Sequence, residues 1–214
     1  EDLKTGEIRE STKADVARIA RLTDALKHMD VLSSPVEARD KPGTSHDLHM
    51  FEAALMNCTK HYACEAENGE RMQAMIEMAK VVAGGTEELK QRPLFSMSAC
   101  PTSPLQLIEE AADVIIESAR SWIPINVLSM VMAGATSPIS VSGALVTHNA
   151  EVLSGIILAQ AANPGSPVIY GSSSTTFDMR YGTAVVGVPE MAMISAAAAD
   201  LANYYGLPSY VAGG

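Results

Sequence analysis

The sequence predicts an α/β fold, a (β/α)8 barrel (TIM barrel) that is present as an incomplete barrel of about six strands. Short β-prone runs alternate with longer helical runs, and the centres of consecutive β-prone runs lie roughly 30 to 42 residues apart, the length of one βα unit. Repeated βα units form a parallel sheet covered by helices. A dinucleotide-binding fold would carry GxGxxG after its first strand, and this motif is missing. Eight units need about 290 residues, so 214 residues hold part of a barrel.

The strands are predicted where β-prone residues follow one another between turn-forming residues. In chain order they are Met29–Leu32, His61–Cys64, Leu94–Ser98, Ile125–Ser129, Val168–Tyr170 and Ser209–Val211.

The helices follow from apolar residues at spacings of three and four. Thr12 and Asp15 form a capping pattern at the first helix, Pro104 suits a helix start, and Gly84 and Gly206 suit helix ends. The low charge of the last two helices indicates burial on more than one side, as in a homo-oligomer. The predicted helices are 12–29, Asp47–Thr59, Glu70–Val82, Leu105–Ala119, Val141–Ala161 and Pro189–Tyr205.

Composition excludes several classes of protein. Twenty-five acidic and 15 basic residues give a net charge of −10, which repels nucleic-acid phosphates and anionic lipids. No apolar run reaches about 18 residues, so no transmembrane helix is expected. Three cysteines and the absence of a signal pattern favour the reducing cytoplasm. We expect residues 1–214 to be part of a single barrel domain, truncated at both ends.

Candidate site residues are sought where strands end, because βα barrels bind substrates there. Glu65 is the carboxylate directly at a predicted strand end; it serves as an acid, a base or a partner for a cation, or it pairs with a neighbouring Lys or Arg. Tyr170 and Tyr210 line a cationic site through their ring faces, or simply pack. Ser172 follows a strand end, and Asp178 either contacts substrate or forms a structural ion pair with Arg180.

Two further kinds of site are weakly indicated. The run 171–176 offers hydroxyl and N–H groups to an anion, but it lacks the lysine of a P-loop and its residues are common in loops. His46 and His49 with Cys58, Cys64 and Cys100 allow a zinc site, although neither HExxH nor CxxC is present. We therefore expect no metal ligand and no directly bound cofactor.

Three segments carry a family resemblance that extends over essentially the whole chain. PGSPVIYGSSSTTFDMRYGTAVVGVPE at 164–190, CPTSPLQ at 100–106 and GLPSYVAGG at 206–214 resemble the trimethylamine–corrinoid methyltransferase family. The resemblance implies a (β/α)8 barrel that moves a methyl group from trimethylamine to the Co(I) corrinoid of a separate corrinoid protein, in methanogenesis from methylamines. In the trimethylamine enzymes of methanogens, the corresponding Gly-Gly precedes pyrrolysine.

The implied chemistry assigns roles to the candidate residues. The imine of pyrrolysine, expected after Gly214, would hold the amine while Co(I) attacks one methyl group. The barrel would orient the amine, with Glu65 facing the methylammonium cation and Tyr170, Ser172, Asp178 and Tyr210 as further substrate contacts.

Three other functions stay open. Relatives without pyrrolysine act on quaternary amines such as glycine betaine. A prematurely ended chain would be an inactive structural fragment. An unrelated barrel lyase or aldolase would need a lysine at a strand end, and none is predicted there.

Overall fold

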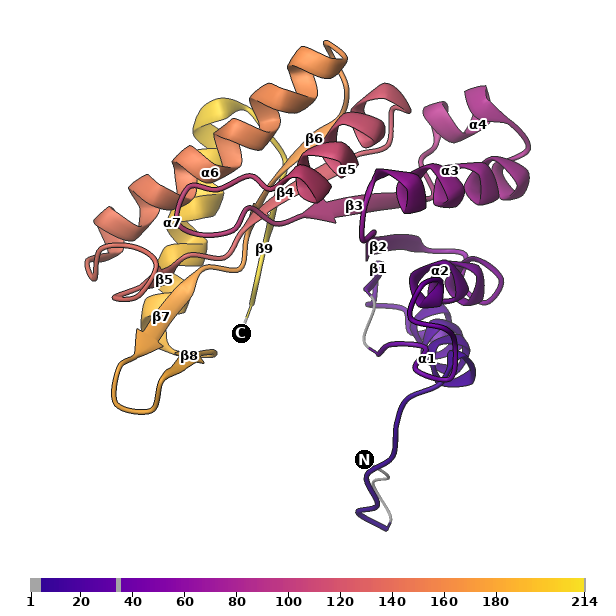
Figure 1. Cartoon of the computed structure of the whole chain (residues 1–214), viewed down its shortest axis with the longest axis horizontal. Helices are drawn as coiled ribbons and strands as arrows, with labels where there is room; N and C mark the ends of the chain where they lie inside the picture. The colour runs from indigo at the N-terminus through magenta and orange to yellow at the C-terminus, as the bar shows by residue number, and fades with distance from the viewer. Residues whose placement is uncertain (1–4, 34–35, 214) are drawn as a thin grey trace. The chain divides into compact units, whose positions relative to one another are not determined.

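The computed structural model describes residues 5–33 and 36–213 and divides the chain into two compact units, Glu1–Ser96 and Met97–Gly214. Both units combine helices with parallel strands, so the α/β class is confirmed (Figure 1). Ser34, Pro35 and Gly214, which belong to predicted strand ends, lie outside the described residues. The assignment of the whole chain to one barrel domain stays a prediction.

Unit 1 is a βα array whose helices bury aromatic and methionine side chains. Strands β1 and β2 are parallel with Val31 opposite His61, and Tyr62 N donates to the Leu94 carbonyl at 3.1 Å beside the start of β3. The ring of Phe51 packs edge-on against Phe95 at 4.9 Å. The elements are α1 (Lys13–Ala25), β1 (Val31–Ser33), α2 (His46–Leu55), β2 (His61–Glu65), α3 (Gly69–Ala83), α4 (Thr86–Gln91) and the first residues of β3 (Phe95–Ala99).

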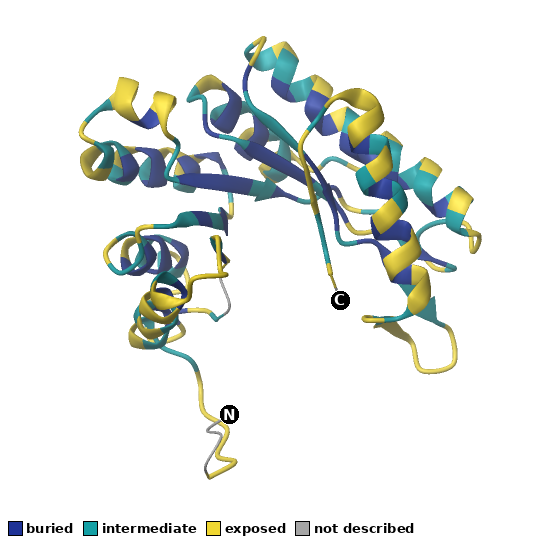
Figure 2. Cartoon of the chain, turned by 180° about the vertical axis from the view of Figure 1, so that it is seen from behind, coloured by how far each residue is buried: buried dark blue, intermediate teal, exposed yellow. Residues whose placement is uncertain are grey.

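Unit 2 has the parallel strand order β3-β4-β6-β9, with a small second sheet of β5, β7 and β8. Most residues of β3 and β4 are buried (Figure 2). The remaining elements are α5 (Glu109–Arg120), β4 (Ile125–Ser129), β5 (Met132–Ala133), α6 (Val141–Ala162), β6 (Val168–Ser172), β7 (Thr175–Asp178), β8 (Thr183–Val185), α7 (Pro189–Tyr205) and β9 (Ser209–Val211).

Helices α5, α6 and α7 cover one face of the unit 2 strands. A Cβ on Gly155 of α6 would meet Val127 Cγ1 at 2.7 Å, so this glycine lets α6 approach β4 closely. Tyr170, which pairs with Val127 in the strand register, packs against residues of α6 and α7. Val127 and Tyr170 are both 0% exposed and therefore belong to the core between sheet and helices.

No transmembrane helix was expected from the sequence, yet the 22 residues of α6 are, by length and composition, sufficient to span a bilayer. A third of the most apolar window is buried, and the helix contains the buried polar residues His148 and Glu151. Its contacts with α5, β4 and β6 are those of a core helix in unit 2.

All six predicted strands are confirmed, whereas three helix boundaries are wrong. The second helix, predicted to end at Thr59, ends at Leu55, and a turn begins at Met56. The first helix ends at Ala25, because Leu26 adopts an extended backbone. The helix predicted from Leu105 begins at Glu109, since Thr102 and Gln106 pair across a tight loop and Leu105 has φ 60°. The short elements α4, β5, β7 and β8 were not predicted.

Candidate substrate-binding and active site

Glu65 ends β2 in unit 1, at the predicted strand end, and its side chain is exposed. Tyr62 and Cys64 are buried on the helix-facing side of β2, so Glu65 lies on the other face, which it shares with His61. Among the described residues, no ion pair to Glu65 is present. Its carboxylate is therefore open to a cation from solution, and its role in substrate binding stays a prediction.

Burial shifts the pKa values of two neighbours of Glu65 on β2, Cys64 and His61. Burial raises the pKa of the Cys64 thiol, and the negative charges of Glu65 and Asp47 raise it further, so the thiol stays protonated. Burial also lowers the pKa of His61, whose Nε2 lies 2.9 Å from Ser96 Oγ. Neither environment produces a reactive nucleophile or a cation at neutral pH.

The face of the unit 2 strands opposite the helices carries a row of small or polar residues, which are Ser98, Asn126 and Gly171. Asn126 precedes Val127, which faces α6, so the amide points to the other side of the sheet. Its Nδ2 donates to Ser98 Oγ at 3.3 Å. Asn126 is 4% exposed, and its Oδ1 has no hydrogen-bond partner among the described residues.

Gly171 is required next to this amide. A Cβ at Gly171 would lie 2.2 Å from Asn126 Oδ1, 2.8 Å from the Val127 carbonyl oxygen and 2.9 Å from Leu128 Cα. Asn126 is not among the site residues predicted from the sequence, because those candidates were sought at strand ends only. A single amide inside the otherwise apolar run Ile125–Leu128 was the available signal.

Tyr210 lies on the same sheet face as the row, because it is paired with Gly171 in the register of β6 and β9. Its side chain is 47% exposed, so a ligand has access to it. Of the four predicted substrate contacts in unit 2, Tyr210 is the one that the strand register places opposite Gly171, on the sheet face that also carries Asn126.

Tyr170 lies on the helix-facing side instead. Its hydroxyl donates to Asn149 Oδ1 at 2.9 Å, and its ring packs edge-on against His148 at 5.4 Å and stacks with Tyr205 at 6.3 Å. Burial raises the pKa of the Tyr170 hydroxyl, with a smaller contribution from Tyr205. These contacts are those of a core residue; contact with substrate stays a prediction for Tyr170.

Ser172 ends β6 and is also fully buried, with its Oγ accepting from Ser174 N at 3.4 Å. Ser173 N and Thr175 N donate to the carbonyl groups of Ser129 and Val131. Because these N–H groups extend the pairing between neighbouring strands, they do not form the open anion-binding loop considered from the sequence. A direct contact of Ser172 with substrate stays a prediction.

Asp178 ends β7 and fixes the hairpin turn to β8. Its Oδ1 accepts from Arg180 N at 2.8 Å and from Tyr181 N at 3.2 Å. Within the described part of the chain, no ion pair joins Asp178 to the Arg180 guanidinium, so the expected structural ion pair is wrong and backbone N–H groups take its place. A substrate contact of Asp178 stays a prediction.

His148 of α6 is 0% exposed and carries a second unpartnered polar atom. Its Nδ1 lies 3.2 Å from Ser174 Oγ, and its Nε2 has no hydrogen-bond partner in the part of the chain that the structure describes. Burial lowers the pKa of His148 to about 4, so the ring is neutral at physiological pH. It lies on the helix side of β6 with Tyr170, away from the face that carries Asn126.

No group of three His, Cys, Asp or Glu residues is placed to hold a metal ion within residues 5–33 and 36–213. Cys58, Cys64 and Cys100 form no disulfide with one another. His46 and His49 contact Glu67 and Glu52, respectively, rather than a shared centre with the cysteines.

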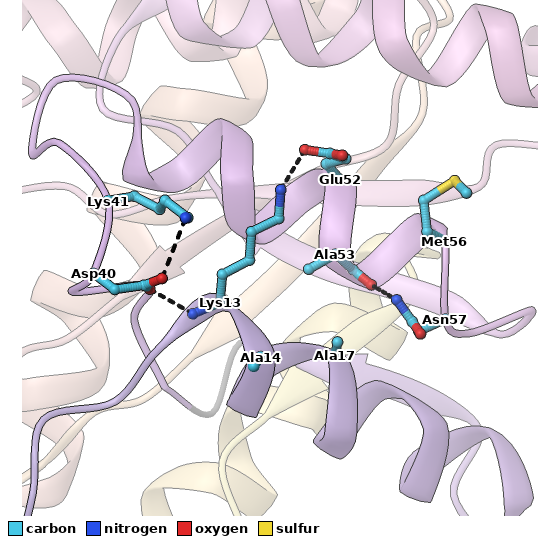
Figure 3. Close-up of a pocket in the computed structure, with 9 residues that line it drawn as sticks. All are labelled: Lys13, Ala14, Ala17, Asp40, Lys41, Glu52, Ala53, Met56 and Asn57. Carbon is cyan, nitrogen blue, oxygen red and sulfur yellow. Dashed lines mark hydrogen bonds and ion pairs between the residues drawn. The ribbon is translucent and has the colours of Figure 1, made fainter.

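A surface pocket of about 380 Å³ lies in unit 1 between α1, α2 and the segment around Asp40 (Figure 3). Lys13 Nζ donates to Glu52 at 2.5 Å, and Asp40 accepts from Lys13 N at 2.6 Å. These charged groups of the pocket therefore bind one another. The pocket contains none of the residues predicted for catalysis.

Comparison with known proteins shows the family. The family model for trimethylamine methyltransferase (MTTB) matches residues 1–214. Trimethylamine methyltransferase MttB of Methanosarcina thermophila is 52% identical over 206 residues, which cover 95% of this chain and 43% of that protein. The MttB protein of Desulfitobacterium hafniense (strain DSM 10664 / DCB-2) is 49% identical over 213 residues, covering 100% and 43%.

A glycine betaine methyltransferase of Desulfitobacterium hafniense (strain Y51) is 37% identical over 210 residues, 98% of this chain and 44% of that protein. The chain thus spans less than half the length of these curated relatives. Since the family model matches every residue, the chain belongs to the trimethylamine methyltransferase family.

Proposed function

We propose that the intact protein transfers a methyl group from trimethylamine to the Co(I) corrinoid of a cognate corrinoid protein, as a step of methanogenesis from methylamines. The observation that carries this proposal is the 49–52% identity to proteins named trimethylamine methyltransferase, against 37% to the glycine betaine enzyme. The corrinoid belongs to the partner and acts as methyl acceptor.

The geometry of each unit supports a site for a small amine. In unit 1, Glu65 offers an exposed carboxylate without an ion-pair partner among the described residues, and a carboxylate attracts a methylammonium ion. In unit 2, one sheet face carries the Asn126 amide, whose Oδ1 has no hydrogen-bond partner among the described residues, and the half-exposed ring of Tyr210. This face is the interior if the parallel strands belong to a closed (β/α)8 barrel, which we propose for the intact protein.

Methyl transfer breaks one carbon–nitrogen bond of the amine, whose electron pair stays on nitrogen, and the product amine takes up a proton. Co(I) supplies both electrons of the new cobalt–carbon bond. We propose that pyrrolysine directly follows Gly214, where its imine would supply the group that holds the amine nitrogen. The residues of this chain would contribute charge and orientation: Glu65 by attraction and the Asn126 face by shape.

We also propose a cytoplasmic location and a homo-oligomeric assembly. The absence of a disulfide among the three cysteines supports the first. The outer side of α6 supports the second, because Val146 is 72% and Ile157 66% exposed. The net charge of −10 argues against nucleic-acid and anionic membrane partners.

Product analysis tests the function. The intact protein, mixed with reduced corrinoid protein, is expected to convert trimethylamine to dimethylamine, detected by proton NMR, and to leave glycine betaine unchanged. Formation of dimethylglycine from glycine betaine, without dimethylamine from trimethylamine, would assign the quaternary-amine activity instead. The 37% identity to a glycine betaine methyltransferase makes that the second candidate.

A further inference from the structure

The buried carboxylate of Glu151 in α6 joins two strand-end segments of unit 2. It is 1% exposed and accepts three hydrogen bonds from neutral donors. Ser129 Oγ, at the end of β4, donates at 2.7 Å. Ser103 Oγ and Leu105 N, both in the loop after β3, each donate at 2.9 Å.

No lysine, arginine or histidine forms an ion pair with Glu151 in the described part of the chain. Glu151 is also the only acidic or basic residue among the 22 residues of α6 apart from His148, which burial keeps neutral. A carboxylate buried without a cation is costly, and an apolar side chain of similar size would stabilise the helix packing at least as well. Packing alone therefore does not explain a glutamate at this position.

The loop that Glu151 binds has a defined and strained backbone. Thr102 and Gln106 pair through two backbone hydrogen bonds of 2.8 and 3.0 Å. Between them, Leu105 has φ 60°, a left-handed conformation that is unfavourable for leucine, and its side chain is 63% exposed. Glu151 accepts the N–H group of this same residue, so it stabilises the strained conformation directly.

We propose that Glu151 is a positioning residue that holds the loop 100–106 against the carboxyl end of β4 and thereby sets the place of Leu105. The loop follows β3 and the anchor Ser129 ends β4, at the edge of the strands where βα folds bind substrate. Glu151 itself is buried on the helix side and does not contact substrate. The inference deepens the proposed function and rests on it for its effect on methyl transfer.

The test compares Glu151→Gln with the wild type in the intact protein. Glutamine has the same size, but its amide offers one acceptor oxygen in place of two, so the three donors cannot all be bound. We expect hydrogen–deuterium exchange in peptides covering residues 100–108 to become at least tenfold faster. We expect kcat/KM for methyl transfer from trimethylamine to fall about tenfold, while the urea midpoint of the whole protein changes little.

Two more variants make the test specific. Ser103→Ala removes one donor on the loop side, and we expect a smaller change in the same two measurements, which also serves if Glu151→Gln folds poorly. Glu110→Gln, at an exposed position on α5, is the matched control and should change neither.

Unchanged exchange in Glu151→Gln and Ser103→Ala would overturn the proposal, because the loop would not depend on the carboxylate. Faster exchange with unchanged kcat/KM would also overturn it, since the loop would then not matter for methyl transfer. A wild-type protein that transfers no methyl group would refute the proposed function instead, and the exchange measurement would still decide whether Glu151 holds the loop.

Discussion

Replacing Gly171 with alanine should destabilise the protein, because the added methyl group has no space between β6 and β4. The new Cβ would lie 2.2 Å from Asn126 Oδ1, 2.8 Å from the Val127 carbonyl oxygen and 2.9 Å from Leu128 Cα. The Asn126 side chain can rotate away, but the other two contacts are with backbone of the neighbouring strand. The parallel pairing from Ile125↔Val168 to Ser129↔Ser172 must therefore widen.

The magnitude follows from three contributions. Overpacking a well-packed site costs about 1–3 kcal/mol. Rotation of Asn126 also breaks its bond to Ser98, which contributes about 1 kcal/mol to stability. The lower entropy of the unfolded chain returns about 0.4–1 kcal/mol. We expect a net loss of about 2 kcal/mol in the free energy of unfolding, equivalent to about a 30-fold larger unfolding constant.

Urea unfolding of the intact protein, followed by far-UV circular dichroism, measures this loss. Gly43→Ala is the matched control, because a Cβ at Gly43 meets no atom within 4 Å and its backbone is not in the left-handed region. A Gly171→Ala variant as stable as Gly43→Ala, within about 0.5 kcal/mol, would refute the close approach of β6 to Asn126.

Three other predictions concern charge. His148 has a pKa of about 4 in the folded protein, against 6.5 for a solvated histidine, so its contribution to the free energy of unfolding is complete above pH 6.5 and falls by about 3 kcal/mol towards pH 4. In His148→Gln, the urea midpoint should depend less on pH across this range. Glu65→Gln should raise KM for trimethylamine about tenfold, about 1.4 kcal/mol of binding, with an unchanged urea midpoint; an unchanged KM would remove Glu65 from the site. Arg71 lies 3.2 Å from the buried carboxylate of Asp47, and Arg71→Ala leaves that carboxylate without its cation. The free energy of unfolding, measured with urea, should fall by about 2 kcal/mol, and Arg71→Lys should lose less.

The main elements could be predicted because their local signals agree with their environment. Strands such as Ile125–Ser129 are short apolar runs between turn-forming residues, and Gly84 and Gly206 end helices in the left-handed conformation that glycine favours. The boundary at Leu105 could not be predicted. Leu105 N donates a hydrogen bond to Glu151, which lies 46 residues further along the chain. The propensities of neighbouring residues cannot predict a hydrogen bond to so distant a residue.

The candidate site was predicted only in outline. Strand ends correctly located Glu65 at the carboxyl end of β2, but position along a strand does not say which face a side chain occupies. That face depends on the register and on the helices, which place Tyr170 in the core and Tyr210 opposite Gly171. Asn126 could be identified only from its close contact with Gly171 in the structure, because a single amide within a strand does not by itself indicate a site.

Methyl transfer to cobalt is the most direct test of the proposed function. The intact protein is mixed with corrinoid protein reduced to Co(I), and the absorbance spectrum is followed after adding trimethylamine or glycine betaine. We expect trimethylamine to convert the Co(I) spectrum to that of methyl-Co(III), while glycine betaine leaves it unchanged. A Co(I) spectrum that persists with trimethylamine but is converted by glycine betaine would contradict the proposed function.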